Sequence, residues 1–173
     1  MSVVLVLGGA RSGKSRFAES LAHQPAHYVA TAQAFDDEMR ERIATHKIQR
    51  GSQWVTHEEP IDLVAKLQEI DVGGYFILVD CLTLWLSNLL LADMDGDAET
   101  QKLVAHLESA ESRIVIVSNE VGLGIVPDNK LARRFRDVQG LANQRVAGVA
   151  LNVVLMAAGL PLILKGPLPT AQL

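Results

Sequence analysis

A glycine-rich segment between an apolar run and a helix-forming run constrains the fold of this chain more than any other feature. Residues 3–7 (VVLVL) are continuously apolar and rich in β-branched side chains, which is typical of a strand buried on both faces of a parallel sheet. Residues 16–22 have helical composition. The pattern G-x-x-x-x-G-K-S lies between them, in the strand–loop–helix context that it requires. Its residues are Gly8, Gly9, Ala10, Arg11, Ser12, Gly13, Lys14 and Ser15.

This pattern predicts a phosphate-binding loop. Its glycines allow the backbone to curl so that N–H groups face the phosphates, and the dipole at the start of the following helix adds to the attraction. We expect Lys14 to contact the β- and γ-phosphates and the Ser15 hydroxyl to ligate Mg²⁺. A glycine-rich turn that fits the pattern by chance is disfavoured, because strand, loop and helix agree. The motif therefore indicates an enzyme that binds a purine nucleoside triphosphate with Mg²⁺.

Apolar runs alternate with helix-forming runs along the rest of the chain. The predicted strands are residues 27–31, 75–80, 113–118, 153–157 and 160–164, and the predicted helices are residues 36–50, 61–70, 82–91, 99–108 and 129–147. This alternation is typical of an α/β layer fold. We expect a single P-loop NTPase domain over residues 1–173, of RecA-like type, with a mainly parallel sheet flanked by helices.

Composition narrows the classes of function. The net charge of −4 argues against non-specific binding of nucleic acid, which needs a positive surface. The lone Cys81 allows no internal disulfide and favours a reducing compartment. No run reaches the roughly 20 apolar residues of a membrane-spanning helix. We therefore expect a cytoplasmic protein with no nucleic-acid partner and no membrane span.

Asp80 ends the predicted strand at 75–80, as the metal-binding carboxylate of a P-loop enzyme does. Such a group holds Mg²⁺ opposite Ser15, directly or through water. An aspartate at a strand end is more often a cap or turn residue when it stands alone. The phosphate-binding loop makes the metal role the favoured interpretation.

The predicted helix at 36–50 places Arg42, His46 and Arg50 four residues apart on one face. Like charge on both sides would keep the His46 imidazole neutral and nucleophilic at pH 7, while the arginines clamp phosphates. From spacing alone, a solvated basic face with an incidental histidine is the favoured interpretation. The loop at residues 119–127 follows the strand at 113–118, so it lies where open α/β sheets place ligands. Its glycines suit a substrate loop, although ordinary turn chemistry explains them nearly as well.

Taken together, these motifs resemble one family over residues 3–165. The matching segments are G-G-A-R-S-G-K-S at 8–15, A-T-A at 30–32, D-D-E-M and R-I…H-K within 36–47, V-D-C-L-T-L-W-L-S-N-L at 79–89, S-N-E-V-G at 118–122, I-V-P at 125–127, R-R-F-R-D at 133–137 and N-Q-R at 143–145. The set is similar to the bifunctional adenosylcobinamide kinase/adenosylcobinamide-phosphate guanylyltransferases of cobalamin biosynthesis.

The resemblance implies two activities. One phosphorylates adenosylcobinamide with ATP or GTP. The other transfers GMP from GTP to adenosylcobinamide phosphate through a guanylylated histidine, which falls on His46. The family's nucleotide contacts fall on the phosphate-binding loop and on Ala30, Thr31, Ala32, Lys47, Ile48, Gln49, Arg50, Glu58 and Asp80. Ala32, Ile48 and Gln49 depart from the more polar residues of relatives. The resemblance also implies a homotrimer.

Two other functions remain to be weighed against this one. A P-loop kinase of a small metabolite would need no covalent intermediate, so His46 would be dispensable. A GTP-binding regulatory protein would report its nucleotide state to a partner, but the sequence lacks the N-K-x-D motif by which G proteins recognise the base. Retention of label from the α-phosphate of GTP distinguishes the guanylyltransferase from both.

Overall fold

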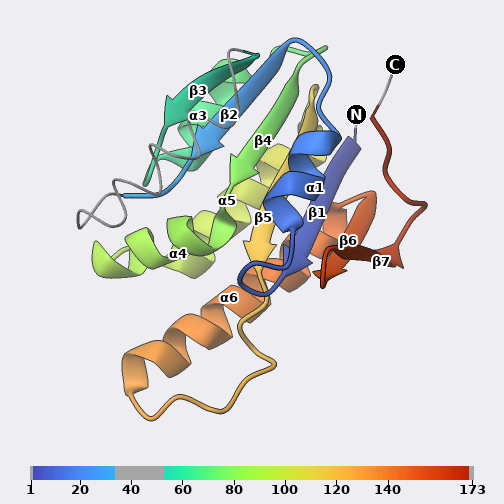
Figure 1. Cartoon of the computed structure of the whole chain (residues 1–173). Helices are drawn as coiled ribbons and strands as arrows, with labels where there is room; N and C mark the ends of the chain where they lie inside the picture. The colour runs from blue at the N-terminus through green and yellow to red at the C-terminus, as the bar shows by residue number, and fades with distance from the viewer. Residues whose placement is uncertain (1, 34–52, 172–173) are drawn as a thin grey trace.

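The computed structural model describes residues 2–33 and 53–171. Its described part is built on a seven-stranded sheet with the strand order β3-β2-β4-β5-β1-β6-β7 (Figure 1). The strands are β1 (Ser2–Gly8), β2 (Ala26–Ala30), β3 (Trp54–Glu58), β4 (Phe76–Asp80), β5 (Arg113–Asn119), β6 (Asn152–Ala157) and β7 (Leu160–Lys165). All neighbouring strands run parallel except β6 and β7, which form an antiparallel pair. The predicted mainly parallel sheet is confirmed.

Helices cover both faces of this sheet. They are α1 (Lys14–Ser20), α3 (Leu63–Ile70), α4 (Leu82–Leu91), α5 (Gly96–Ser109) and α6 (Lys130–Val149). Helix α1 packs on one face, and α3, α4, α5 and α6 pack on the other (Figure 1). Side chains of β1 alternate between these two layers: Val4 and Val6 join the core under α1, whereas Leu5 lies in the core under the other helices. Because both faces are covered, β1 is apolar without interruption.

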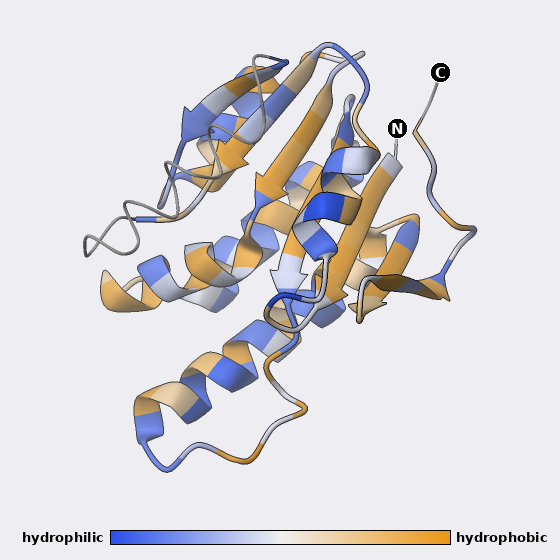
Figure 2. Cartoon of the chain, viewed as in Figure 1, coloured by the Kyte–Doolittle hydropathy of each residue, from blue (hydrophilic) through white to orange (hydrophobic). Residues whose placement is uncertain are grey.

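The hydropathy pattern follows these layers. The central strands are almost uniformly apolar, whereas apolar and polar residues alternate along α6 and α4 is mostly apolar (Figure 2). Trp85 on α4 is fully buried and Trp54 on β3 is nearly so, which places both rings in the core. Among the described residues, no helix is long and apolar enough to span a membrane.

Most predicted elements are present within the described ranges with small shifts of their bounds, and two differences are larger; the predicted helix at 36–50 lies outside these ranges. Strand β3 was not expected, because its sequence WVTHE is mostly polar; it lies at one end of the described strand order, where several of its side chains face solvent. Helix α5 begins at Gly96 rather than Glu99, because the side chain of Asp95 accepts hydrogen bonds from the backbone N–H groups of Asp97 and Ala98.

Parallel pairing brings the carboxyl ends of the central strands to a single edge. Gly8 of β1 pairs with Asn119 of β5, and Ala30 of β2 pairs with Asp80 of β4. The predicted phosphate-binding loop, the predicted metal ligand and the loop after β5 all leave the sheet at this edge. Open α/β folds bind ligands at this position.

Candidate nucleotide site at the carboxyl edge of the sheet

The loop between β1 and α1 has a backbone that its sequence makes possible. Gly13 has φ 94° and Arg11 has φ 55°, so the chain enters the left-handed region twice within three residues. The backbone N–H of Ser12 donates to the carbonyl of Gly9, and Phe17 N–H donates to the carbonyl of Gly13. The turn between β6 and β7 supports the loop from behind, because the Gly159 N–H donates to the Ser12 carbonyl at 3.0 Å.

Glycine at two of these positions is required by space as well as by conformation. A Cβ atom on Gly13 would lie 3.2 Å from the Cα atom of Gly159. A Cβ atom on Gly8 would lie 2.4 Å from Oγ of Ser12 and 2.8 Å from the carbonyl oxygen of Met156. Glycine at positions 8 and 13 therefore avoids clashes with the Ser12 side chain, the Met156 carbonyl and the backbone of Gly159.

Lys14 is the first residue of α1 and reaches back over the loop. Its Nζ atom donates a hydrogen bond to the carbonyl of Gly9 at 2.8 Å. Burial lowers the pKa of this ammonium from its usual value, and the nearby acidic groups Cys81 and Asp80 oppose that shift. A half-buried cation held over a phosphate-binding loop can contact the phosphates of a nucleotide without moving far.

Asp80 is oriented by a buried tyrosine. The hydroxyl of Tyr28, which is fully buried on β2, donates to Oδ2 of Asp80 at 2.5 Å. The ring of Trp54 packs against Tyr28 edge-on, with 5.6 Å between ring centroids. Since the hydrogen bond occupies one carboxylate oxygen, Oδ1 remains available as a ligand. Tyr28 carries no sequence signal for this role, because a contact between strands depends on sheet register.

Three predicted contact positions form a row across neighbouring strands. Ala30 pairs with Glu58 of β3 on one side and with Asp80 of β4 on the other. Trp54, Phe76 and Leu78 belong to the core under α1, and side chains two residues apart on a strand share a face. Glu58 and Asp80 therefore lie on the same face of the sheet as α1 and Lys14. The structure brings these separate parts of the sequence together.

Thr31 has a structural role at this edge. Its hydroxyl donates to the Cys81 carbonyl at 2.7 Å and accepts from the Cys81 N–H at 2.8 Å. Asn88 on α4 donates to the carbonyl of Thr31 at 2.8 Å. Because Thr31 is fully buried, its side chain fixes the end of β2 to the start of α4. Ala32, the next predicted contact, is partly exposed.

A buried polar network fixes the end of β5 beside the phosphate-binding loop. The Ser118 hydroxyl donates to Oδ1 of Asn143 and accepts from Nε2 of Gln139, both on α6. The backbone N–H of Asn119 donates to Oγ1 of Thr83 at 2.7 Å, and Nδ2 of Asn143 donates to the Asn119 carbonyl. These contacts give a fixed starting point to the loop predicted to bind substrate.

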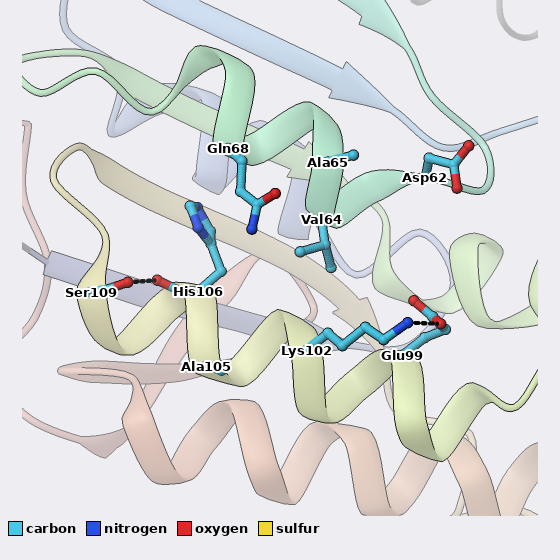
Figure 3. A pocket seen from close by; sticks show the side chains of 9 residues that line it. All are labelled: Asp62, Val64, Ala65, Gln68, Glu99, Lys102, Ala105, His106 and Ser109. Atoms are coloured by element: carbon cyan, nitrogen blue, oxygen red, sulfur yellow. Dashed lines mark hydrogen bonds and ion pairs between the residues drawn. The ribbon is translucent and has the colours of Figure 1, made fainter.

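A pocket of about 550 Å³ lies between α3 and α5 (Figure 3). His106 of α5 and Gln68 of α3 project into the same space, while Lys102 forms an ion pair with Glu99 along the helix (Figure 3). No residue of the phosphate-binding loop lines this pocket, and its helices cover the face of the sheet opposite α1. It is therefore separate from the predicted nucleotide site.

The residues at the carboxyl edge suit Mg²⁺. Ser15 and Asp80 offer hard oxygen ligands, and Asp80 is held in place by Tyr28. Within the described ranges, no three His, Cys, Asp or Glu side chains gather as a metal cluster. Mg²⁺ needs no such cluster, since it commonly binds one or two protein oxygens together with nucleotide phosphates and water. The donor set thus fits Mg²⁺ held jointly by protein and nucleotide.

Several predicted residues lie outside the described ranges. These are Arg42, the predicted nucleophile His46, and the predicted nucleotide contacts Lys47, Ile48, Gln49 and Arg50.

Solved structures with the same architecture share the fold at low sequence identity. The flagellar accessory protein FlaH from Methanocaldococcus jannaschii superposes with a TM-score of 0.56 at 14% identity, covering 99% of this chain and 81% of that one. The KaiC-like protein PH0186 from Pyrococcus horikoshii gives a TM-score of 0.52 at 12% identity, with coverage of 99% and 83%. These similarities support the predicted P-loop NTPase fold.

Sequence relatives match nearly the whole chain. The bifunctional adenosylcobalamin biosynthesis protein CobP of Pseudomonas aeruginosa is 49% identical over 169 residues, covering 94% of this chain and 96% of its own. The corresponding CobU proteins of Salmonella typhimurium and Escherichia coli are 40% and 39% identical, each covering 94% of this chain and 99% of their own. The family model described as cobinamide kinase/cobinamide phosphate guanyltransferase matches residues 4–164. The chain therefore belongs to the cobinamide kinase/cobinamide phosphate guanyltransferase family.

Proposed function

We propose that this protein catalyses two consecutive reactions at the carboxyl edge of its sheet. In the first, the γ-phosphoryl group of ATP or GTP passes to the aminopropanol hydroxyl of adenosylcobinamide. In the second, GMP passes from GTP to the resulting phosphate, giving adenosylcobinamide-GDP and pyrophosphate. The observation that carries this proposal is the family match over residues 4–164, which includes an intact phosphate-binding loop with Lys14 beside Asp80.

Nucleotide phosphates are proposed to bind to the backbone N–H groups of residues 8–15. The dipole of α1 and the ammonium of Lys14 act on the same phosphate groups. Ser15 and Asp80 would hold Mg²⁺, which when bound neutralises phosphate charge as the transferred group departs. Ala30, Thr31, Ala32 and Glu58 border this region, and Thr31 acts by fixing the backbone of Cys81.

For the second reaction we propose His46 as the nucleophile. Its neutral imidazole nitrogen attacks the α-phosphorus of GTP, the bond to the bridging oxygen breaks, and pyrophosphate leaves. An oxygen of adenosylcobinamide phosphate then attacks the same phosphorus and releases the imidazole. Arg42 and Arg50 would clamp the phosphates, and Lys47, Ile48 and Gln49 would line the nucleotide.

The protein is further proposed to act in the cytoplasm as a homotrimer with no nucleic-acid partner. The support for the trimer is family resemblance. The support for the other two statements is the single cysteine and the net charge of −4.

Incubation with GTP labelled on its α-phosphate tests the covalent step. The wild type should retain one GMP, and the adduct should be lost in acid and stable in alkali, as a phosphoramidate is. His46→Ala should abolish both labelling and guanylyl transfer but still phosphorylate adenosylcobinamide, because that step needs no protein nucleophile.

His57→Ala supplies a matched control, since it removes another histidine and should leave labelling intact. A label that persists in His46→Ala, or maps to another residue, contradicts the assignment of the nucleophile. If the wild type phosphorylates its substrate but retains no label, a P-loop kinase without a covalent intermediate is favoured. GTP binding with neither transfer would favour a regulatory protein.

A further inference from the structure

The loop between β5 and α6 exposes large aliphatic side chains to solvent. Leu123 is 86% exposed, Ile125 is 97% exposed and Val126 is 56% exposed, while Leu131 in the first turn of α6 is 57% exposed. We call Leu123, Ile125, Val126 and Leu131 the apolar loop patch. The apolar stretch is visible where this loop runs from β5 to α6 (Figure 2). Single exposed aliphatic residues are common, but four within nine positions form a patch of the kind found at binding surfaces.

Both ends of the loop are held by hydrogen bonds. The Glu120 N–H donates to the carbonyl of Gly8, the first residue of the phosphate-binding loop, at 3.2 Å. At the other end, Nη1 of Arg133 donates to the carbonyls of Pro127 at 2.9 Å and Asp128 at 2.6 Å. Asn129 caps α6 through the N–H of Ala132. The apolar loop patch therefore has a fixed place that begins at the phosphate-binding loop.

Cations border this patch. Lys130, Arg133, Arg134 and Arg136 lie in the first two turns of α6. Acidic residues also occur here: Asp137 pairs with Arg136 at 3.5 Å, and Glu120 and Asp128 lie in the loop itself. An aliphatic surface that begins at the phosphate-binding loop suits a ligand with a bulky apolar body whose reacting group must reach the nucleotide. The nucleotide does not need this surface, because the loop at residues 8–15 and Asp80 already provide for its phosphates and metal.

We propose that the apolar loop patch is the docking surface for the corrinoid acceptor. The inference rests on the proposed function, which supplies an acceptor with these two parts: a macrocycle with extensive apolar faces, and a side chain that ends in a hydroxyl and, after the first reaction, a phosphate. The macrocycle lies on Leu123, Ile125 and Val126. The side chain points along the loop toward Gly8, which brings its hydroxyl, and later its phosphate, to the phosphate-binding loop.

The double variant Leu123→Ser/Ile125→Ser tests this surface. Its KM for adenosylcobinamide should rise by about tenfold or more, because two aliphatic contacts are lost, while kcat and the KM for GTP stay near the wild-type values. Equilibrium dialysis of adenosylcobinamide should show the same loss of affinity without turnover. Leu151→Ser is the control: this leucine is also exposed, at 56%, but lies beside the start of β1, at the opposite edge of the sheet.

Hydrogen exchange on the wild type tests the same surface without a substitution. Saturating adenosylcobinamide should slow exchange in residues 121–128 beyond any effect of GTP alone, and unchanged exchange overturns the proposal. A wild-type KM in the double variant also overturns it. The proposal is also overturned if the double variant elutes on gel filtration with a different molecular mass from the wild type while its KM is unchanged. That result would show that the patch contacts a second copy of the chain. Covalent labelling with GTP needs no corrinoid, so its failure in the wild type marks a failure of the proposed function instead.

Discussion

At the scale of single residues, the cation and carboxylate of the site are held by different means. Lys14 is half-buried and hydrogen-bonded to its own loop, whereas the carboxylate of Asp80 is held by Tyr28 from the neighbouring strand. Both side chains keep groups for a ligand: the Lys14 ammonium has three donors and uses one of them on Gly9, and Asp80 retains Oδ1 for a metal. The site can therefore exist before its ligands arrive.

Lys14→Ala should remove both activities and leave the fold intact. The ammonium contacts a loop carbonyl and not the core, so its loss affects charge neutralisation during transfer more than stability. We expect phosphoryl transfer to fall by on the order of 10²-fold or more. Transfer assays paired with circular dichroism check this. Normal phosphorylation of adenosylcobinamide by the variant would refute the role of the phosphate-binding loop.

Asp80→Asn and Tyr28→Phe should both lower the affinity for Mg²⁺ and so raise the Mg²⁺ concentration that turnover needs, to different degrees. Asparagine is a poor ligand for a hard cation, so Asp80→Asn should give the larger effect. Tyr28→Phe keeps the carboxylate but frees its orientation, which should weaken metal affinity by about 10-fold. Mg²⁺ titration of turnover and Mn²⁺ binding by electron paramagnetic resonance measure this. An unchanged titration in Asp80→Asn would make Asp80 a strand-end cap.

Cys81→Ala should keep nearly full activity. Burial, together with the adjacent Asp80, raises the pKa of the Cys81 thiol to about 12, so the thiol stays protonated at neutral pH. Its contacts with Thr31 use backbone atoms that alanine retains, and the lost sulfur should cost on the order of 1 kcal/mol of stability. Steady-state assays and thermal melts measure both effects. A large loss of activity would show that the thiol takes part in catalysis.

At the scale of elements, sequence patterns located the apolar strands, including the exposed β7, and missed β3, whose sequence is mostly polar. Strand β1 and its loop were predictable because the motif dictates their backbone locally. Strand β3 was missed because polar side chains at Thr56, His57 and Glu58 hide its pattern. The link from Tyr28 to Asp80 could not be foreseen, since it depends on the register of β2 against β4.

Strand β3 is joined to β2 by a histidine pair that should respond to pH. Nδ1 of His27 lies 2.8 Å from Nε2 of His57, so one ring must be neutral to accept the hydrogen bond. Burial lowers the pKa of both histidines from 6.5. The pKa of His27 is lowered further by the nearby His57. The pKa of His57 is lowered further by Lys66, while Glu69 opposes this shift. Tyr75 also packs on His27.

Because these pKa values are lower in the folded state, the unfolded chain binds more protons below pH 6.5. The stability from the pair is therefore present above that pH and lost as pH falls through the folded values. Between pH 7 and pH 5, the melting temperature of the wild type should fall by about 1–3 °C more than that of His57→Gln, a modest difference because both rings are partly exposed. Equal slopes in the two proteins would show that the pair does not couple folding to pH.

At the scale of the whole molecule, one sheet connects every described part of the site. The phosphate-binding loop, Glu58, Asp80 and the apolar loop patch all follow strands of the same sheet, and the two cores share those strands. Sequence alone gave the α/β class and the order of most elements. It could not place the loop after β5 against Gly8, because that contact joins residues more than a hundred positions apart.

The shared sheet predicts that the chain unfolds as one unit and that nucleotide stabilises all of it. Urea unfolding should give coincident transitions by tryptophan fluorescence, which reports the buried Trp85, and by far-ultraviolet circular dichroism. GTP with Mg²⁺ at 100 times its dissociation constant should add about 2.7 kcal/mol to the free energy of unfolding. Lys14→Ala should lose most of that increase at the same GTP concentration, because its affinity is lower, while keeping the wild-type midpoint without nucleotide. Two separated transitions would divide the chain into independent units, and an equal GTP effect in Lys14→Ala would place nucleotide binding away from the β1–α1 loop.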